Sequence, residues 1–273
     1  MTLTEPNKAE AAVQAAGRFA VFVGQTIRYL PQTLGRYRGQ TWQAMNGLAW
    51  GRGSVLVDGG ILSVLLIMGA AMGASVAIEA FSILNLMGFG PLSGIVGGVA
   101  NVREMAPLVT GIAFAIQAGT RMTAEIGAMR ISEEIDALES VAIHPIPYLV
   151  TTRVLASAMA VIPLFVVCLA LNFLVCQLVV FLASGQASGT YLHYFTLMLS
   201  GRDMVFAVIK VAVFVAIMST VQCYYGFYAA GGPQGVGIAA GRAMRLSITL
   251  MVVTNMMLTM AFWGVDSGGR LGG

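Results

Sequence analysis

Residues 151–183 read TTRVLASAMAVIPLFVVCLALNFLVCQLVVFLA, and within this stretch only Arg153 carries a charge. A hydrocarbon core about 30 Å thick needs about 20 apolar residues in a helix, so the stretch is long enough to cross a membrane. The whole chain is 58% hydrophobic and 10% charged, with a mean hydropathy of +0.82, whereas ordinary globular domains carry roughly 25% charged residues. The sequence therefore predicts an all-α integral membrane protein. Five spans are expected, at about 55–80, 104–128, 151–183, 204–229 and 244–265.

The distribution of basic residues predicts the orientation of these spans, since Lys and Arg gather on the cytoplasmic side. Basic residues precede the first span, flank the connection between the second and third, and follow the fourth. We therefore expect a multi-pass protein of the cytoplasmic (inner) membrane. An odd number of spans then places the N-terminus in the cytoplasm and the C-terminus outside. The residues concerned are Lys8, Arg18, Arg28, Arg36, Arg38, Arg52, Arg130, Arg153, Arg242 and Arg245.

Residues 1–50 are predicted to be a cytoplasmic N-terminal region, and residues 51–273 the membrane domain. Within 10–48, apolar residues recur every three or four positions with basic residues between them, the pattern of helices that lie in the membrane interface. A soluble helix packed on a partner is the alternative. The spaced apolar residues do not resemble a signal peptide.

Two uncharged, glycine-rich stretches lie between spans. Residues 81–101 read FSILNLMGFGPLSGIVGGVAN. Backbone at membrane depth must have its hydrogen bonds satisfied, so we expect a short helix or re-entrant turn there. Residues 231–237 read GGPQGVG and lack the Gly-Lys-Ser/Thr ending of a phosphate-binding loop. We expect a loop or turn at 231–237.

The connection 131–143 has the pattern of a short amphipathic helix. Ile131, Ile135, Leu138 and either Val141 or Ala142 recur on one face, and Ser132 is a suitable N-cap. Acidic residues occupy the other face and suit the positive end of a helix. A dozen residues cannot span a membrane, and anionic lipids would repel four carboxylates, so we expect a cytoplasmic docking element for another protein. The alternative is a helix that lies free at the surface. The acidic residues are Glu133, Glu134, Asp136 and Glu139.

The second predicted span carries two stripes with a period of four residues. Small residues form the first, which allows another helix to approach closely; they are Gly111, Ala115, Gly119, Thr123 and Gly127. Gln117, Arg121 and Glu125 form the second. Arg121 and Glu125 face a cavity or partner, or they brace the bundle as an i,i+4 pair, and the sequence does not separate these alternatives.

Four further polar residues lie in or beside the spans, and three of them, Arg103, Glu104 and Lys210, fall in the predicted outer half of the membrane. Arg103 and Glu104 precede the second span, Lys210 lies inside the fourth, and Asn255 lies in the middle of the fifth. Each long charged side chain taken alone is explained by snorkelling to the interface. Their common depth favours a polar cluster that opens outward.

No catalytic or metal-binding constellation can be assembled from the sequence. His144 and His193 fall in connections on opposite sides of the membrane, and Cys168, Cys176 and Cys223 lie in apolar runs, where a thiol packs as a small hydrophobe. We therefore expect no catalytic residues, no metal and no disulfide. A formal net charge of +3 provides no polycationic surface for nucleic acid.

The run 121–139, RMTAEIGAMRISEEIDALE, resembles the signature of the MlaE/YrbE permease family, the membrane subunits of Mce-type ABC lipid transporters. Arg103-Glu104-Met105-Ala106-Pro107 is similar to the Arg-Glu-Leu-Gly-Pro of that family, and the resemblance covers about 50–265. It implies five spans, an N-terminal interfacial helix, and a coupling helix at about 131–143 that docks into a separate ATPase. ATP and Mg would be bound by that ATPase, with no cofactor in this chain.

The resemblance also implies partners and site residues. Two permeases pair around a lipid cavity that faces Mce proteins outside the membrane. Arg103, Glu104, Lys210 and Asn255 would belong to that cavity, and Glu133, Glu134, Asp136, Leu138 and Glu139 to the ATPase contact. Glu134 replaces the usual glutamine of the family, and Asn255 stands where some relatives carry aspartate. Both departures are similar to YrbE proteins that form heterodimers.

We therefore predict a permease subunit of an ATP-driven lipid transporter that performs no chemistry itself, and we expect import as the direction. The cargo, whether fatty acid, phospholipid or sterol, is left open. The first alternative is an ion-coupled secondary transporter of a hydrophobic substrate, which would need interrupted helices, paired repeats and ionisable residues near mid-membrane. The second is a membrane-embedded lipid enzyme, which would need a catalytic constellation.

Overall fold

The computed structural model describes residues 8–51, 60–184 and 188–264, and every regular element within these ranges is helical. Five helices are long and apolar enough to cross a membrane. This confirms the predicted five-span, all-α class. The spans are α4 (Gly60–Leu86), the continuous stretch Gly90–Ile131, the stretch Ile146–Ala183, α11 (Gly201–Phe227) and α12 (Gly232–Trp263).

Two of the spans are composite helices. Gly90–Ile131 contains η1 (Gly90–Leu92), α5 (Ser93–Ala100), α6 (Ala106–Phe114) and α7 (Thr120–Ile131), with π-helical turns at η2 (Asn101–Met105) and η3 (Ala115–Gly119). Ile146–Ala183 starts with the π-helical η4 (Ile146–Thr151) and continues as α9 (Thr152–Ser184). The short helix expected within 81–101 corresponds to α5, which is the first part of the second span and not a separate element.

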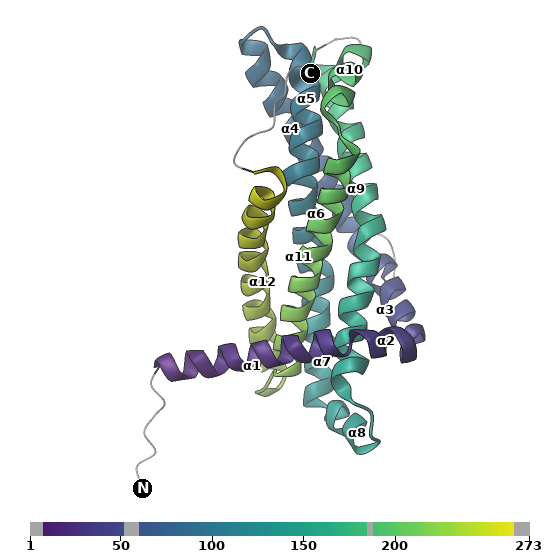
Figure 1. Cartoon of the computed structure of the whole chain (residues 1–273), viewed down its shortest axis with the longest axis vertical. Coiled ribbons are helices and arrows are strands. Elements are labelled where there is room, and N and C mark those ends of the chain that lie inside the picture. The colour runs from purple at the N-terminus through teal and green to yellow at the C-terminus, as the bar shows by residue number, and fades with distance from the viewer. Residues whose placement is uncertain (1–7, 52–59, 185–187, 265–273) are drawn as a thin grey trace.

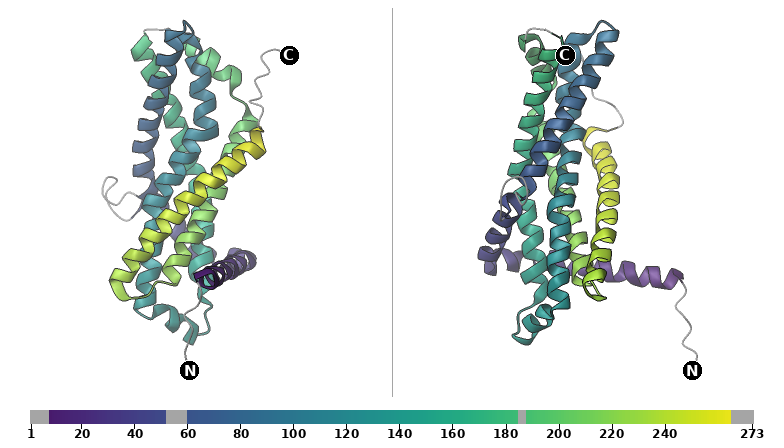
Figure 2. Two further views of the ribbon diagram at one scale, coloured as in Figure 1. Left: turned by 90° about the vertical axis from the view of Figure 1, so that its left-hand side faces the viewer. Right: turned by 180° about the vertical axis from the view of Figure 1, so that it is seen from behind.

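The long helices form one bundle, with α11 packed between α7, α9 and α12 (Figure 1). In the left view of Figure 2, α12 crosses the outside of the bundle obliquely. Only 11% of its most apolar window is buried, compared with 44% for α11. Much of α12 is therefore available to lipid or to another subunit.

The N-terminal region consists of α1 (Lys8–Arg28), α2 (Leu30–Arg36) and α3 (Arg38–Trp50). Helix α1 lies across one end of the bundle, the end from which α8 (Glu134–Ser140) also projects (Figure 1). We call this the α1 end. Phe22 of α1 is buried, and its ring centroid lies 5.3 Å from that of Tyr224 in α11. A crosswise amphipathic helix fixed in this way has the geometry of an interfacial helix.

The sequence-based prediction was wrong at residues 231–237, because α12 already begins at Gly232. Gly231 has a φ of +92°, which glycine adopts without a Cβ clash. Pro233 then lies in the first turn, where a helix loses nothing from its missing N–H. The turn is therefore confined to residues before Gly232, and the fifth span begins twelve positions earlier than the predicted 244.

The predicted N-cap role of Ser132 was also wrong. Helix α7 continues to Ile131, Ser132 is its C-cap, and α8 begins only at Glu134, after Glu133 with a φ of +59°. The Ser132 hydroxyl oxygen lies 3.1 Å from the carbonyl oxygen of Ala128 and 2.8 Å from Glu134 Oε1, either of which can accept its proton.

Helix α10 (Ser188–Met198) was not predicted from the sequence, and it packs against α5.

Candidate functional site

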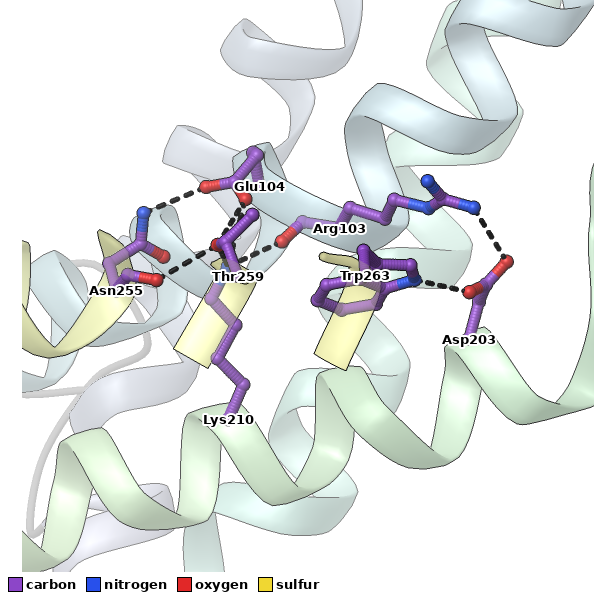
Figure 3. Close-up of polar contacts among 7 residues, drawn as sticks. All are labelled: Arg103, Glu104, Asp203, Lys210, Asn255, Thr259 and Trp263. Carbon is purple, nitrogen blue, oxygen red and sulfur yellow. Dashed lines mark hydrogen bonds and ion pairs between the residues drawn. The ribbon is translucent and has the colours of Figure 1, made fainter. Parts of the chain in front are cut away.

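Glu104 is the centre of a polar cluster near the end of α12 that is remote from α1 (Figure 3). Its Oε1 accepts hydrogen bonds from Lys210 Nζ at 3.0 Å and from the Thr259 hydroxyl at 2.6 Å. Its Oε2 accepts one from Asn255 Nδ2 at 2.7 Å. These residues come from η2, α11 and α12, so the carboxylate joins three elements that are far apart in the sequence.

Lys210 is fully buried, and its ammonium is surrounded by acceptors. Besides Glu104, it donates to the Thr259 hydroxyl at 2.8 Å and to the main-chain carbonyl of Arg103 at 2.7 Å. In an α-helix that carbonyl would accept from the N–H of residue 107, but residue 107 is proline and has none. The ammonium thus donates to a carbonyl that lacks its α-helical donor at position 107.

A second group of polar contacts adjoins the first. Arg103 Nη2 lies 3.4 Å from Asp203 Oδ2, and the Trp263 indole N–H donates to Asp203 Oδ1. The Arg103 guanidinium and the Lys210 ammonium lie 5.4 and 5.6 Å from the centroid of the Trp263 ring. The two cations, Arg103 and Lys210, are therefore matched in number by two carboxylates, Asp203 and Glu104.

The structure thus brings together all four residues that the sequence analysis placed in the outer polar cluster. It adds Asp203, Thr259 and Trp263, which that analysis missed. Asn255, Thr259 and Trp263 are spaced by four residues and share one helical face, so this periodicity is a signal in the sequence. Asp203 has no such signal, because its partners lie 60 and 100 residues away.

Two buried atoms of the cluster have no hydrogen-bond partner among the described residues. They are Asn255 Oδ1, an acceptor, and Arg103 Nε, a donor. Buried polar atoms are usually paired, so each of these two atoms lacks the partner that such atoms normally have. The described residues contain no group of three or more His, Cys, Asp or Glu side chains that could hold a metal ion.

The polar stripe of the second span forms an ion-pair network at the α1 end. Arg121 Nε lies 2.9 Å from Glu125 Oε1, and Arg153 of α9 lies 3.5 Å from Glu125 Oε2. All three side chains line a pocket of about 300 Å³ between α3, α7 and α9. Gln117, one turn away in η3, does not line it. The Arg121–Glu125 pair therefore has a structural partner in α9.

The stripe of small residues faces α11 and α12. A Cβ at Gly119 would lie 3.0 Å from Gln222 Nε2, and one at Gly127 would lie 2.8 Å from a methyl group of Val236. A Cβ at Gly111 would clash with Met251 Sδ and would lie 3.5 Å from Met218 Cε. The Thr123 hydroxyl donates to the Gln222 carbonyl at 3.0 Å. The close helix approach expected from this stripe is thus present.

Helix α8 carries the predicted coupling residues. Ile135 is fully buried and Leu138 packs against the core, whereas Glu133, Glu134, Asp136 and Glu139 are exposed. Asp136 accepts from Arg130 of α7 at 2.7 Å, which fixes α8 to the end of the second span. The apolar face of α8 is narrower than the sequence pattern predicts, since Val141 is 64% exposed.

Comparisons with known proteins agree with this architecture. The family model "Permease MlaE" matches residues 52–261. The chain is 30% identical over 202 residues to the chloroplast protein TRIGALACTOSYLDIACYLGLYCEROL 1 of Arabidopsis thaliana, covering 74% of this chain and 58% of that protein. It is 32% identical over 163 residues to a probable ABC transporter permease protein of Rickettsia bellii, covering 60% and 63%.

A probable ABC transporter permease protein of Synechocystis is 31% identical over 176 residues, covering 60% of this chain and 64% of that protein. The chain thus spans less than two thirds of the length of these relatives. The family model, in contrast, covers all five spans apart from the last two residues of α12. On this match and on the five-span fold, the chain belongs to the MlaE permease family.

Proposed function

We propose that this chain is the membrane subunit of an ATP-driven lipid transporter, in which a separate ATPase subunit binds at α8 and a second permease pairs with this one. The α1 end lies in the cytoplasm, and the Glu104 cluster lies toward the outer face. Lipid occupies a cavity between the two permeases and passes to Mce proteins outside the cytoplasmic membrane, with import as the direction.

The observation that carries this proposal is the polar cluster beside an exposed apolar face of α12. The cluster provides an unpartnered acceptor on Asn255 and an unpartnered donor on Arg103. Beside it, α12 exposes five large apolar side chains at helical spacing, which suit acyl chains and the adaptable packing of methionine. They are Val252, Val253, Met256, Met257 and Met260, each more than half exposed.

The names of the relatives support the cargo and the energy source. Several relatives are named as ABC transporter permeases, and the name of the Arabidopsis relative is that of a glycolipid. An ABC permease requires an ATP-hydrolysing partner. The exposed acidic face of α8 is a suitable contact for such a partner, because α8 projects beyond the bundle (Figure 1).

A second permease of the YrbE type, rather than a copy of this chain, is proposed from two residues. Glu134 makes α8 more acidic than the usual family pattern, and Asn255 removes the carboxylate that some relatives carry. In the structure Asn255 donates to Glu104 and does not pair with Lys210. The carboxylate opposite Lys210 is therefore supplied by Glu104, and position 255 is free to differ between two paired subunits.

The test is purification of the tagged full chain in mild detergent, followed by mass spectrometry of its bound proteins and lipids. We expect an ATPase, a second five-span permease and Mce proteins, together with a defined lipid. Recovery of the chain alone, or of the chain with copies of itself, would contradict the proposed assembly and favour the ion-coupled alternative.

The ATPase contact is tested by reversing charge on α8. The double variant Glu134→Lys/Glu139→Lys leaves the Arg130–Asp136 pair intact, and we expect recovery of the ATPase to fall at least about tenfold while the second permease is retained. Arg36→Glu, an exposed change on α2 at the same end, is the matched control and should retain the ATPase. Equal recovery from all three proteins would exclude α8 as the docking element.

A further inference from the structure

A large cavity lies at the α1 end, far from the Glu104 cluster. Helix α1, the end of α11 and the start of α12 enclose about 800 Å³. Its lining combines two arginines with aromatic and aliphatic side chains, among them Arg18, Tyr224, Tyr225, Tyr228, Ile238 and Arg242. We call it the Arg18 cavity.

The wall formed by α1 and α11 is held in place by aromatic contacts. The ring centroid of Phe19 lies 5.1 Å from that of Tyr224 in an edge-on arrangement, and Phe22 lies 6.0 Å from Tyr228. Tyr224 and Tyr228 are themselves 5.0 Å apart. Aromatic pairs at these distances each add about 0.5–1.5 kcal/mol beyond area burial, so the cavity exists before any ligand binds.

The charge in the Arg18 cavity is uncompensated. None of the residues that line it carries a carboxylate, and α12 contains no Asp or Glu along its length. Within the described part of the chain, neither Arg18 nor Arg242 forms an ion pair or a hydrogen bond through its guanidinium. Four other arginines of the spans, Arg103, Arg121, Arg130 and Arg153, do have carboxylate partners.

The position of the cavity identifies the kind of anion. Helix α1 lies across the end of the bundle, so it runs in the plane of the membrane surface, where phospholipid headgroups lie (Figure 1). Ile238 is 52% exposed and lines the same cavity, and Leu246 lies two turns further along α12. The cavity therefore offers guanidinium groups at headgroup level and an apolar path along α12 for an acyl chain.

We infer that the Arg18 cavity binds the phosphate of an anionic phospholipid from the leaflet in which α1 lies. Arg18 and Arg242 hold the phosphate from two sides, and guanidinium groups bind phosphate oxygens in a bidentate manner. The lipid then connects α1 to α12. This site is separate from the Glu104 cluster, and its occupancy does not depend on the cargo of the transporter.

The test measures binding of phosphatidylglycerol to the purified full chain in a neutral detergent by native mass spectrometry, with phosphatidylcholine as the zwitterionic comparison. We expect Arg18→Gln/Arg242→Gln to weaken phosphatidylglycerol binding at least about tenfold, because each basic side chain beside an anionic headgroup contributes about fivefold. Phosphatidylcholine binding should be unchanged.

The matched control is Arg28→Gln/Arg245→Gln, which removes one arginine from α1 and one from α12, both exposed and outside the cavity. We expect it to keep phosphatidylglycerol binding within about twofold of the unchanged protein. An equal loss in both double variants would show a general attraction to positive charge and overturn the proposed site, as would no loss in either.

Inorganic phosphate separates a lipid site from a small-anion site. At millimolar concentration it should not displace phosphatidylglycerol, because it lacks the acyl chains that lie along Ile238. Displacement would show that the cavity holds a free anion and would contradict the proposal. Thermal unfolding of each variant, which should match that of the unchanged protein, checks that lost binding does not come from lost folding.

Discussion

The two ends of α12 differ in whether the charged side chains around them have partners. Near Trp263, the charged groups of Arg103, Glu104, Asp203 and Lys210 form two ion pairs at 3.4 and 3.0 Å, and Lys210 is completely buried. Near Gly232, Arg18 and Arg242 are exposed, and neither forms an ion pair with any residue whose side chain the structure describes. A charge that is buried must have a partner within the fold, whereas a charge at the membrane surface is available to a ligand. The first end holds α12 to the bundle, and the second is open to lipid.

The largest effect is expected from Lys210→Met. The substitution leaves Glu104 without its cation and removes the hydrogen bond from the ammonium to the Arg103 carbonyl, and breaking a buried pair from one side costs about 3–5 kcal/mol. We expect a loss of that order in the free energy of unfolding, measured by denaturation in detergent. The double variant Lys210→Met/Glu104→Gln should recover part of it, because no unpaired charge remains. A loss below about 1 kcal/mol for Lys210→Met would mean that this end of α12 is not held by the pair.

A smaller effect is expected from Trp263→Phe. This change keeps an aromatic ring beside Arg103 but removes the N–H that donates to Asp203. Hydrogen bonds to charged groups contribute about 1.5–3 kcal/mol, and the remaining Arg103–Asp203 pair limits the loss to about 2 kcal/mol. The same denaturation assay measures it. If Phe262→Leu, which leaves the Asp203 contact intact, destabilised the protein equally, the effect would come from lost packing.

The smallest effect on stability is expected from Arg242→Gln at the other end. Because this guanidinium is exposed and has no partner within the described chain, the free energy of unfolding in neutral detergent should change by no more than about 0.5 kcal/mol. Addition of phosphatidylglycerol should raise the unfolding temperature of the unchanged protein more than that of the variant. A large loss in the free energy of unfolding without added lipid would show that Arg242 is also needed for folding, and the two ends would then not differ.

The fold follows from hydropathy, which acts locally along the chain, and for this reason all five spans were predictable. Their limits were less so, because hydropathy does not locate where a helix begins. The start of α12 lies in a glycine-rich segment, and only the positive φ of Gly231 and the position of Pro233 define it. Helix α10 is short and carries polar residues among its aromatics, so no span-length window detects it.

The candidate site was predictable only in part. Arg103, Glu104, Lys210 and Asn255 stand out because charged and amide side chains are rare in apolar runs. Asp203 does not stand out, since it follows Gly201 at the start of a helix, where an acidic residue is common. That it meets Arg103 and Trp263 depends on how η2, α11 and α12 pack, and no local pattern encodes that packing.

The contact between Lys210 and the Arg103 carbonyl limits what mutagenesis can detect at this site. The acceptor is main chain, so no substitution of the Arg103 side chain removes it. Replacing the side chains along Gly90–Ile131 other than Pro107 would therefore report the ion pairs of this segment and overlook its backbone link to α11. Position 210 exposes that link because it supplies the ammonium, and position 107 does so because any residue other than proline supplies an N–H that could compete for the carbonyl.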